Sequence, residues 1–375
     1  MRSGNGRGIK TNMTEMTNKR RISRKVYVGK TAIGGGAPVT IQSMLNVPTT
    51  DVDACVKQAE ELVRAGCDLI RVAVPDEASA EAFGKIAKRT GLSLIADVHY
   101  SYRLAHLALD NGAKKIRMNP GNMRDFGEIR DLARRMSDAG VPVRVGVNGG
   151  SLDPKFAGKE ESEALVESAL ECANAFESCG MRDVVLAIKA SDVRVMLAAN
   201  RKAAAVTDYP LHLGVTEAGT LRSGLVRSAL GIGALLEEGI GDTVRFSLSA
   251  PPVEEVAAGK TLLAALGLRT DCAEVVSCPT CARTEINVQE LAAAVERAVA
   301  HVRLPLRIAV MGCPLNGIGE GKNSNLGIAG GKEKSVIMKD GEIVTTVSNE
   351  LLMPLFMSML DDYIAEYSKN KKNRE

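Results

Sequence analysis

The stretch Asp68-Leu-Ile-Arg-Val-Ala-Val74, followed by the run Glu77 to Thr90, shows the pattern that decides the fold. A short apolar strand precedes a segment whose apolar residues recur at helical spacing, and Gly91 closes that helix. From Val39 onward the chain contains eight such pairs. Strand–helix alternation repeated eight times over roughly 230 residues is typical of a (β/α)8 barrel, or TIM barrel, so the sequence predicts an α/β fold of this class.

The other strand candidates are equally short and apolar. They are Val39 to Ser43, Ser93 to His99, Lys115 to Asn119, Val141 to Asn148, Asp183 to Lys189, Leu211 to Glu217 and Thr243 to Ser249. The helical runs between them include Asp51 to Ala65, Tyr102 to Gly112, Glu160 to Cys179 and Leu221 to Glu238, and most are closed by Gly or Asn.

A second pattern begins near residue 270. Its predicted elements are a helix from Asn287 to Val302, a strand before Cys313, a hairpin of Ser335 to Met338 and Glu342 to Val347, and a closing helix from Asn349 to Tyr367. These elements predict a small α+β domain. Residues 1–24 are basic and polar without an apolar period, so we expect a disordered tail, a barrel domain at 25–268 and a second domain at 269–375.

Charge and aromatic content argue against several classes of partner. The formal net charge is only +3, aromatic residues make up 3% of the chain and Trp is absent. A nucleic-acid partner needs basic and stacking surfaces, so we expect none. We find no secretory signal and no apolar run of membrane length, and eight irregularly spaced cysteines are typical of a reducing compartment. We therefore expect a cytoplasmic protein without membrane contact.

Three cysteines of the second domain suggest a metal centre. Cys278-Pro-Thr-Cys281 can turn both sulfurs toward one ion or cluster, and Cys313-Pro314 follows thirty-two positions later. The second Cys-x-x-Cys pair of a zinc ribbon is missing, and a thioredoxin-like pair leaves Cys313 unexplained. An iron–sulfur cluster is the favoured interpretation, with zinc and plain reduced thiols as alternatives.

The glycine-rich segment from Gly312 to Lys322 does not match a phosphate-binding loop. Asn316 and Asn323 stand where that motif needs Gly and Ser or Thr. The glycines suit close approach of the backbone to an inorganic cluster, whose sulfides accept N–H hydrogen bonds. Glu320, considered alone, is most simply a solvated carboxylate.

Cationic residues end five of the predicted strands, at the edge where such barrels carry their active sites. They are Arg71, Arg117, Arg144, Lys189 and Arg245, joined by the polar residues Asn119, Asn148, Ser191, Ser247 and Ser249. Five cations on one rim repel one another unless an anion neutralises them. We therefore expect a phosphorylated small molecule to bind there.

Acidic residues are sparse at the same rim. They are Asp97 and Glu217, and a carboxylate among arginines can act as a base, an orienting group or a ligand for a hydroxyl. For Glu217 we favour a functional role over a structural salt bridge, whereas both roles remain open for His99. We interpret His212, with the other two histidines, as a packing residue.

Six motifs span nearly the whole chain. They are Ile41-Gln-Ser-Met44, Arg117-Met-Asn-Pro-Gly-Asn122, Gly146-Val-Asn148, Thr216-Glu-Ala-Gly219, Ser277-Cys-Pro-Thr-Cys-Ala-Arg-Thr284 and Gly312-Cys-Pro-Leu-Asn-Gly-Ile-Gly-Glu320. Together they resemble the 4-hydroxy-3-methylbut-2-enyl diphosphate synthase family of the methylerythritol phosphate route to isoprenoids. The chain lacks the large insert of the plant form and is similar to the two-domain bacterial type.

The resemblance implies a 4Fe-4S cluster bound by Cys278, Cys281 and Cys313, with Glu320 as the fourth ligand. This replaces the solvated-carboxylate interpretation of Glu320. It also implies reductive opening of 2-C-methyl-D-erythritol 2,4-cyclodiphosphate, with loss of water and uptake of two electrons from flavodoxin or ferredoxin. A cyclic diphosphate would account for the cationic rim.

Site roles follow from the same resemblance. The expected substrate-binding residues are Arg71, His99, Arg117, Asn119, Arg144, Asn148, Lys189, Arg245 and Ser247. The expected catalytic residues are Glu217, Asp97 and Glu320. Two alternatives remain: a barrel enzyme resembling pteroate synthases with a structural zinc module, and a non-enzymatic iron-sensing protein.

The direction of the barrel predicts a dimer. Each helix runs back along its strand, so the chain leaves the eighth helix near Leu268 at the end opposite the cationic rim. About ten residues, 269–278, span at most roughly 35 Å when fully extended, which leaves no length to pass around the barrel. A head-to-tail homodimer, in which each second domain caps the partner's rim, would solve this problem.

Overall fold

The computed structural model describes residues 20–98, 101–118, 126–156 and 158–372. The chain divides into two compact units, Met1–Leu268 and Arg269–Glu375. Each unit has its own hydrophobic core. No helix in the described ranges is long and apolar enough to cross a membrane.

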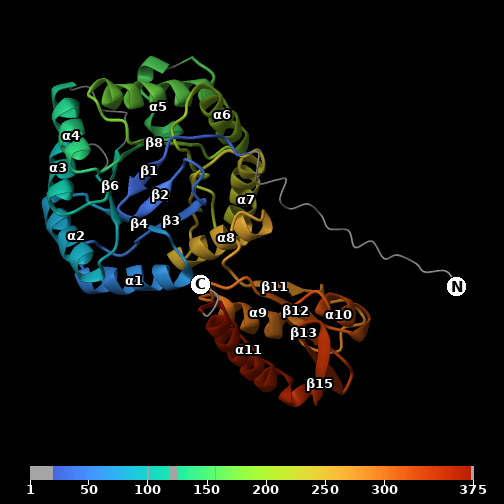
Figure 1. Ribbon diagram of the computed structural model, residues 1–375. Helices are drawn as coiled ribbons and strands as arrows, with labels where there is room; N and C mark the ends of the chain where they lie inside the picture. Colours follow the sequence, from blue (N-terminus) through green and yellow to red (C-terminus); the bar gives the residue numbers. More distant parts are fainter. Residues whose placement is uncertain (1–19, 99–100, 119–125, 157, 373–375) are drawn as a thin grey trace. The chain divides into compact units, whose positions relative to one another are not determined.

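The first unit contains eight parallel strands, as the sequence predicts. They are β3 (Thr40–Met44), β4 (Leu69–Ala73), β5 (Leu94–Asp97), β6 (Lys115–Met118), β7 (Val143–Asn148), β8 (Val184–Lys189), β9 (His212–Leu213) and β10 (Thr243–Val244). Their order is β8-β7-β6-β5-β4-β3-β10-β9, and a bridge between Leu186 and Leu211 joins the two outer strands. The strands therefore form a nearly closed barrel, and the predicted (β/α)8 class is confirmed (Figure 1).

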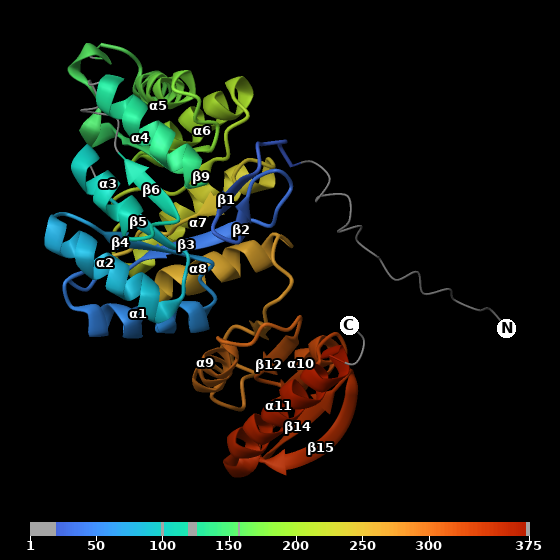
Figure 2. The ribbon, with the colours of Figure 1, turned by 60° about the vertical axis from the view of Figure 1, so that its left-hand side comes forward.

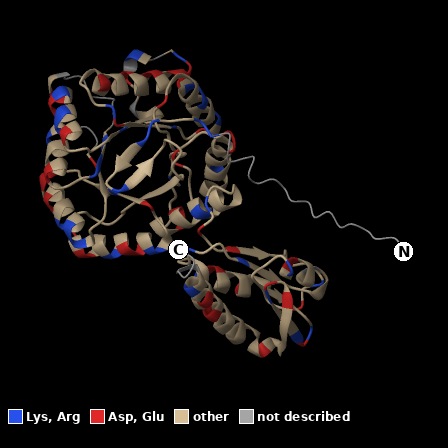
Figure 3. Cartoon of the chain, viewed as in Figure 1, with Lys and Arg blue, Asp and Glu red and all other residues tan. Residues whose placement is uncertain are grey.

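Eight helices surround the strands (Figures 1 and 2). They are α1 (Val52–Ala65), α2 (Glu77–Thr90), α3 (Tyr102–Asp110), α4 (Phe126–Asp138), α5 (Glu161–Ser178), α6 (Val193–Val206), α7 (Leu221–Glu237) and α8 (Pro252–Ala265). Local signals explain their ends: the Asp51 side chain accepts a hydrogen bond from the Ala54 N–H, and Gly66 ends α1 with a φ of 100°. Both positive and negative residues occur along these helices (Figure 3).

Alternate residues of each strand face opposite sides of the barrel wall. Ile70 and Val72 belong to the core between strands and helices, so Leu69 and Arg71 face the barrel interior. The same alternation turns Asp97 and Arg117 inward, in register on neighbouring strands. The barrel interior therefore carries charged side chains that the strands hold at fixed positions.

Strands β9 and β10 are shorter than predicted. The sequence suggests Leu211 to Glu217 and Thr243 to Ser249, but regular pairing ends at Leu213 and Val244. Gly214 follows β9 directly, and only glycine fits there, because a Cβ at this position would lie 2.7 Å from the Arg245 carbonyl oxygen. The following residues form the loops that carry Glu217 and Ser247.

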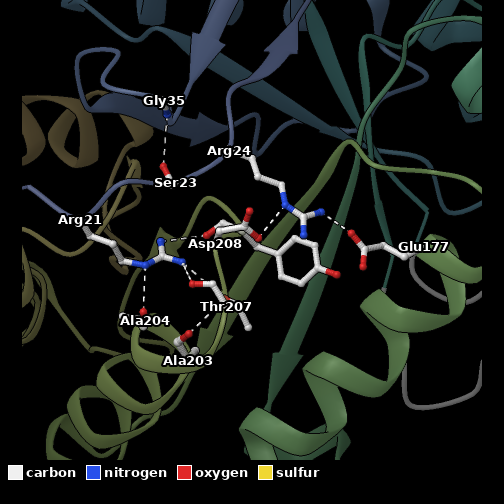
Figure 4. Close-up of polar contacts among 10 residues, drawn as sticks. Arg21, Ser23, Arg24, Gly35, Glu177, Ala203, Ala204, Thr207 and Asp208 are labelled. Carbon is white, nitrogen blue, oxygen red and sulfur yellow. Dashed lines mark hydrogen bonds and ion pairs between the residues drawn. The ribbon is translucent and has the colours of Figure 1, made fainter.

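Residues 20–24, which the sequence places in the disordered tail, are instead bound to the barrel (Figure 4). Arg21 donates hydrogen bonds to the carbonyl oxygens of Ala204 (3.1 Å) and Tyr209 (3.0 Å). Arg24 pairs with Asp208 at 2.6 Å and also with Glu177. The predicted tail is therefore too long by these five residues; positions 1–19 lie outside the described ranges.

A hairpin that the sequence analysis missed follows this segment. It consists of β1 (Val26–Val28) and β2 (Thr31–Ile33), and it lies at the centre of the ring of strands in Figure 1. Val28 and Ile33 form a buried cluster with Leu69 and Ile95, which lie at or next to the amino ends of β4 and β5. The hairpin therefore closes the amino end of the barrel.

The second unit is built on a five-stranded sheet. Its strands β11 (Glu274–Ser277), β12 (Arg307–Met311), β13 (Leu326–Ala329), β14 (Lys334–Lys339) and β15 (Glu342–Ser348) lie in sequence order, and its helices are α9 (Val288–Val299), α10 (Pro314–Gly321) and α11 (Asn349–Lys372). The predicted hairpin is confirmed, with Asp340 and Gly341 at φ 49° and 85° in its turn. Strands β11 and β13 and helix α10 were not predicted.

Candidate substrate and metal sites

Four of the five predicted rim cations are buried inside the barrel. Arg71, Arg117 and Lys189 are less than one-tenth exposed, and Arg144 is 2% exposed. Arg245, just after β10, is half-buried, and electrostatic interactions link it to Arg71, Arg144 and Lys189. The structure therefore brings together all five cations that the sequence places at strand ends.

Asp97 lies between two of these arginines and is 2% exposed. Its carboxylate is 3.4 Å from Arg71 Nε and accepts a hydrogen bond from Arg117 Nη1 at 3.0 Å. The Arg71 side chain also contacts the sulfur of Met44. These contacts hold both guanidinium groups in place, which is an orienting role within the site.

A second buried acid, Glu255 on α8, was not predicted. Its carboxylate accepts a hydrogen bond from Ser43 Oγ at 2.9 Å and lies 3.6 Å from Arg245 Nε. No sequence pattern singles out this residue, because Glu255 lies in a helix rather than at a strand end. Within the described residues, Asp97 and Glu255 are the acids whose ion pairs reach the five cations.

Two glycines of the inner wall make room for the cationic side chains. A Cβ on Gly146 would lie 3.2 Å from Arg117 Nε and 3.4 Å from Arg144 Nη2. A Cβ on Gly214 would lie 2.7 Å from Lys189 Nζ. A side chain at Gly214 would therefore clash, and one at Gly146 would crowd the two arginines, so both glycines shape the site; Gly146 belongs to the Gly146-Val-Asn148 motif, whereas Gly214 was not predicted.

Burial lowers the pKa values of Arg71, Arg144 and Lys189. Desolvation lowers the pKa of Arg71 to about 9, with Asp97 opposing and Arg245 and Arg117 adding to the effect. Desolvation and neighbouring cations hold the pKa values of Arg144 and Lys189 well below their ordinary values. A bound polyanion would remove this unfavourable charge density, so the arrangement suits a diphosphate.

Glu217 occupies an unusual backbone position. Its φ is 54°, the left-handed region that costs a non-glycine residue roughly 1 kcal/mol or more, and its side chain is exposed. Such strain is common at functional sites, although the sequence shows no sign of it. Asn148 and Ser247 are half-buried near the ends of their strands. His99 and Asn119 lie outside the described residues.

The three cysteines lie at the carboxyl ends of two neighbouring parallel strands. Cys278 follows β11 and Cys313 follows Gly312 at the end of β12. The Cys278 sulfur accepts a hydrogen bond from the Gly312 N–H at 3.1 Å. Cys281 is exposed, and its pKa is lowered chiefly by a hydrogen bond from the Arg283 backbone. Thiolate-stabilising N–H groups around sulfur are what a soft metal centre requires.

Glu320 does not lie with the cysteines in this conformation. It occupies the far end of α10, and its carboxylate is 3.8 Å from Arg307 Nη2, at the beginning of β12. Glu320 is seven positions after Cys313 along this helix, a rise of about 10 Å. Accordingly, no three His, Cys, Asp or Glu side chains of the described segments are arranged to hold a metal ion. The three cysteines supply the soft sulfur donors that a cluster needs, but in this conformation neither they nor Glu320 are grouped around one point.

Two family models together cover most of the chain. The GcpE TIM-barrel domain matches residues 23–260, and the GcpE protein C-terminal domain matches residues 274–362. The matched segments correspond closely to the barrel and to the unit that contains the cysteines.

Similar proteins are known by name. A protein of Caldanaerobacter subterraneus named 4-hydroxy-3-methylbut-2-en-1-yl diphosphate synthase (flavodoxin) is 45% identical, over 94% of this chain and 100% of its own length. A protein of the same name from Anoxybacillus flavithermus is 43% identical, over 96% and 100%. Among solved structures, Xanthomonas albilineans dihydropteroate synthase superposes with a TM-score of 0.48 at 17% identity, over 66% of this chain and 97% of that one.

Proposed function

The chain belongs to the GcpE family of 4-hydroxy-3-methylbut-2-en-1-yl diphosphate synthases, and we propose that it opens 2-C-methyl-D-erythritol 2,4-cyclodiphosphate reductively. In this reaction a ring carbon–oxygen bond to phosphate breaks and a hydroxyl group leaves as water. Two electrons and two protons are taken up, and the product is the linear hydroxymethylbutenyl diphosphate. The alternative of a pteroate-synthase-like enzyme with a zinc module is not favoured.

The observation that carries this proposal is the group of five cations, four of them buried in the barrel. Among the described residues, Asp97 and Glu255 form ion pairs with these cations, which sets two carboxylates against five positive charges. A cyclic diphosphate supplies the missing negative charge, and planar guanidinium groups bind phosphate oxygens in pairs. Arg71, Arg117, Arg144, Lys189 and Arg245 would hold the two phosphates, with His99, Asn119, Asn148 and Ser247 around the ring.

The roles of Glu217 and Asp97 are proposed from where their side chains lie in the barrel unit. Glu217 is exposed in the loop after β9, so its carboxyl group is available to transfer a proton or to bind the departing hydroxyl. Asp97 keeps Arg71 and Arg117 in the orientation that binds phosphate. This assigns Asp97 to substrate orientation rather than to proton transfer.

Cys278, Cys281 and Cys313 would bind a 4Fe-4S cluster. When bound, such a cluster supplies electrons one at a time. Glu320 becomes the fourth ligand only if α10 opens and releases its carboxylate from Arg307. A carboxylate is a weaker ligand for iron than a thiolate, so Glu320 would hold its position on the cluster less tightly than the three cysteines hold theirs.

Flavodoxin is the proposed electron donor, as the names of the relatives state for those proteins. Ferredoxin is the second donor to test. None of the eight cysteines forms a disulfide, which agrees with a reducing compartment, and we place the protein in the cytoplasm.

The head-to-tail homodimer remains our proposal for the complete site. Two features of the separate units support it. The boundary falls after Leu268 and β11 begins at Glu274, so five residues, 269–273, connect the units and reach at most about 18 Å. In the second unit, Leu315 and Ile318 of α10 are exposed, at 73% and 37%. An exposed apolar pair beside the cysteines suits a surface that a partner's barrel covers.

The cysteine assignment is tested by metal content and turnover. We expect Cys278→Ala, Cys281→Ala and Cys313→Ala, each purified without air, to lose bound iron, because each removes one of three soft ligands. Iron per chain and consumption of the cyclodiphosphate with reduced flavodoxin would be measured. Cys67→Ala, at a buried cysteine of the barrel, is the control and should keep its iron. Normal iron content in any of the three variants would remove that cysteine from the proposed ligand set.

A further inference from the structure

A second layer of polar side chains lies inside the barrel, next to the residues assigned to phosphate. Lys115 begins β6, His212 begins β9 and Gln42 lies in β3. Lys115 and His212 are 0% exposed and Gln42 is 1% exposed. Within the described part of the chain, Lys115 Nζ, His212 Nδ1 and both amide atoms of Gln42 have no hydrogen-bond partner.

These three side chains point toward the barrel axis. Lys115 is in register with Ile95, and Gln42 with Leu69, the two residues that contact the closing hairpin inside the barrel. His212 is in register with Thr243. Around the ring, β3 and β6 are separated by two strands, β6 and β9 by two, and β9 and β3 by one. The three groups therefore approach one region from different sides.

His212 also contacts a proposed substrate-binding residue. Its Nε2 lies 3.4 Å from Arg144 Nη1. A guanidinium group has only donors, so Nε2 must accept this hydrogen bond and the imidazole proton must be on Nδ1. Burial and the surrounding cations hold the pKa of His212 well below 6.5, which agrees with a neutral ring.

We propose that His212 is a positioning residue for Arg144. On the other side of the imidazole ring, ordered water bound to His212 Nδ1, Lys115 and Gln42 would hold the ring in place. This rests on the proposed function, in which Arg144 binds a phosphate. The hydrogen bond to Nε2 uses one N–H of Arg144 and fixes the plane of its guanidinium group. The remaining N–H groups then face the ligand in one orientation.

Water is the ligand that suits His212 Nδ1, Lys115 Nζ and the Gln42 amide. Nδ1–H is a donor, the Gln42 amide offers both a donor and an acceptor, and a neutral amine offers a lone pair. Buried polar groups without protein partners are usually bridged by water with two to four such contacts. Burial, with Arg144 and Arg71 nearby, holds the pKa of Lys115 well below its ordinary value, which agrees with a neutral amine.

A pair of matched substitutions tests the position of the acceptor. His212→Gln places an amide oxygen near the former Nε2, whereas His212→Asn places its amide near Nδ1 and cannot reach Arg144. We expect His212→Asn to raise KM for the cyclodiphosphate about tenfold, the loss of one hydrogen bond to a charged group, with kcat nearly unchanged. His212→Gln should recover most of the affinity. Thr243→Val, in register with His212 and bonded to Thr40 Oγ1 at 2.8 Å, is the control and should keep the wild-type KM.

A double-mutant cycle separates positioning from packing. If His212 acts through Arg144, the double variant Arg144→Ala/His212→Asn should bind no more weakly than Arg144→Ala alone. Additive losses, or equal defects in His212→Asn and His212→Gln, would overturn the proposal. The tautomer can be read in the wild-type protein by 15N-histidine NMR, since the chain has only four histidines. A proton on Nε2 of His212 would overturn it even if no His212 variant folds.

The KM values of these variants also distinguish a failure of the positioning role from a failure of the proposed function. An unchanged KM in Arg144→Ala would show that Arg144 does not bind phosphate, and the proposed role of the rim would fail with it. A raised KM in Arg144→Ala beside a wild-type KM and Tm in His212→Asn would refute the positioning role alone.

Discussion

Glu217 combines an exposed carboxylate with a strained backbone, and this combination gives the sharpest prediction for a single residue. We expect Glu217→Gln to keep the iron content and KM of the wild type while kcat falls at least about 100-fold, since proton transfer contributes in the transition state. Iron analysis and steady-state kinetics with reduced flavodoxin would measure this. Glu217→Asp, which keeps the charge one methylene shorter, is the comparison. An unchanged kcat in Glu217→Gln would assign the carboxylate to a salt bridge.

For individual residues, the sequence predicted which charged side chains belong to the site, but it did not predict which side chains contact one another. Arg71, Arg117, Arg144 and Lys189 could be found because strand ends form the working edge of a barrel. His212 was interpreted as a packing residue, because nothing in the sequence shows that it reaches Arg144. Contacts between side chains of β7 and β9 depend on the barrel's curvature, which a linear pattern does not contain.

Helix α10 contains a glycine that its helical conformation does not require. Gly317 and Gly321 are needed for packing, since a Cβ on them would lie 2.4 Å from Ala329 Cβ and 2.3 Å from Met338 Sδ. A Cβ on Gly319 would meet nothing within 4 Å. The helix therefore gives no reason for glycine at 319, next to the predicted ligand Glu320. A second, opened conformation of this segment would give one.

This reasoning predicts the effect of Gly319→Ala. Alanine should stabilise the helical form by about 1 kcal/mol and slow cluster uptake roughly fivefold, because Glu320 is released less often. Iron incorporation into the cluster-free protein over time would measure this, together with hydrogen exchange of residues 314–321. Gly233→Ala in α7, where the nearest atom is 3.4 Å away, is the control and should not change the rate. Equal uptake rates in Gly319→Ala and wild type would mean that α10 does not open.

The segment at 20–24 gives a prediction about pH. The hydrogen bond from Arg24 lowers the pKa of Asp208 from 3.8, so the stabilising carboxylate is present above the unfolded-state pKa and is lost as pH falls through the folded-state pKa. We expect Asp208→Asn to lower Tm at neutral pH and to differ less from wild type below about pH 4. In an Arg24→Ala background the same substitution should show no such pH dependence. A constant Tm difference at all pH values would contradict the role of this pair.

Element prediction succeeded where the local signal was strong and failed where contacts elsewhere decide the structure. The barrel strands and the Asp340-Gly341 hairpin have clear periodicity and turn residues. The segment at 20–24 looks disordered, because its stability comes from Asp208, Glu177 and carbonyl groups almost two hundred residues away. Strand β11 is short and lies at the sheet edge, so it exists only through its pairing with β12.

For the whole molecule, the shared-site dimer predicts complementation between two inactive variants. Glu217→Ala damages the barrel site and Cys313→Ala the cluster site, so mixing them under conditions that exchange subunits should restore one working site in each mixed dimer. Activity would be measured after exchange is proven by mass-labelled subunits. Mixing Glu217→Ala with Asp97→Ala, both in the barrel, is the control and should stay inactive. A monomer with full activity, or an inactive exchanged mixture, would rule out the model.

The hairpin β1–β2 has a consequence for the order of events in turnover. Because Val28 and Ile33 pack against Leu69 and Ile95 at the amino end of the barrel, we expect ligands to enter and leave at the opposite end, the rim. Substrate and product, both diphosphates, must then pass the same arginines in opposite directions. Neither can enter while the other is still bound, so release of product precedes each new binding event. The product should therefore act as a competitive inhibitor of its own precursor.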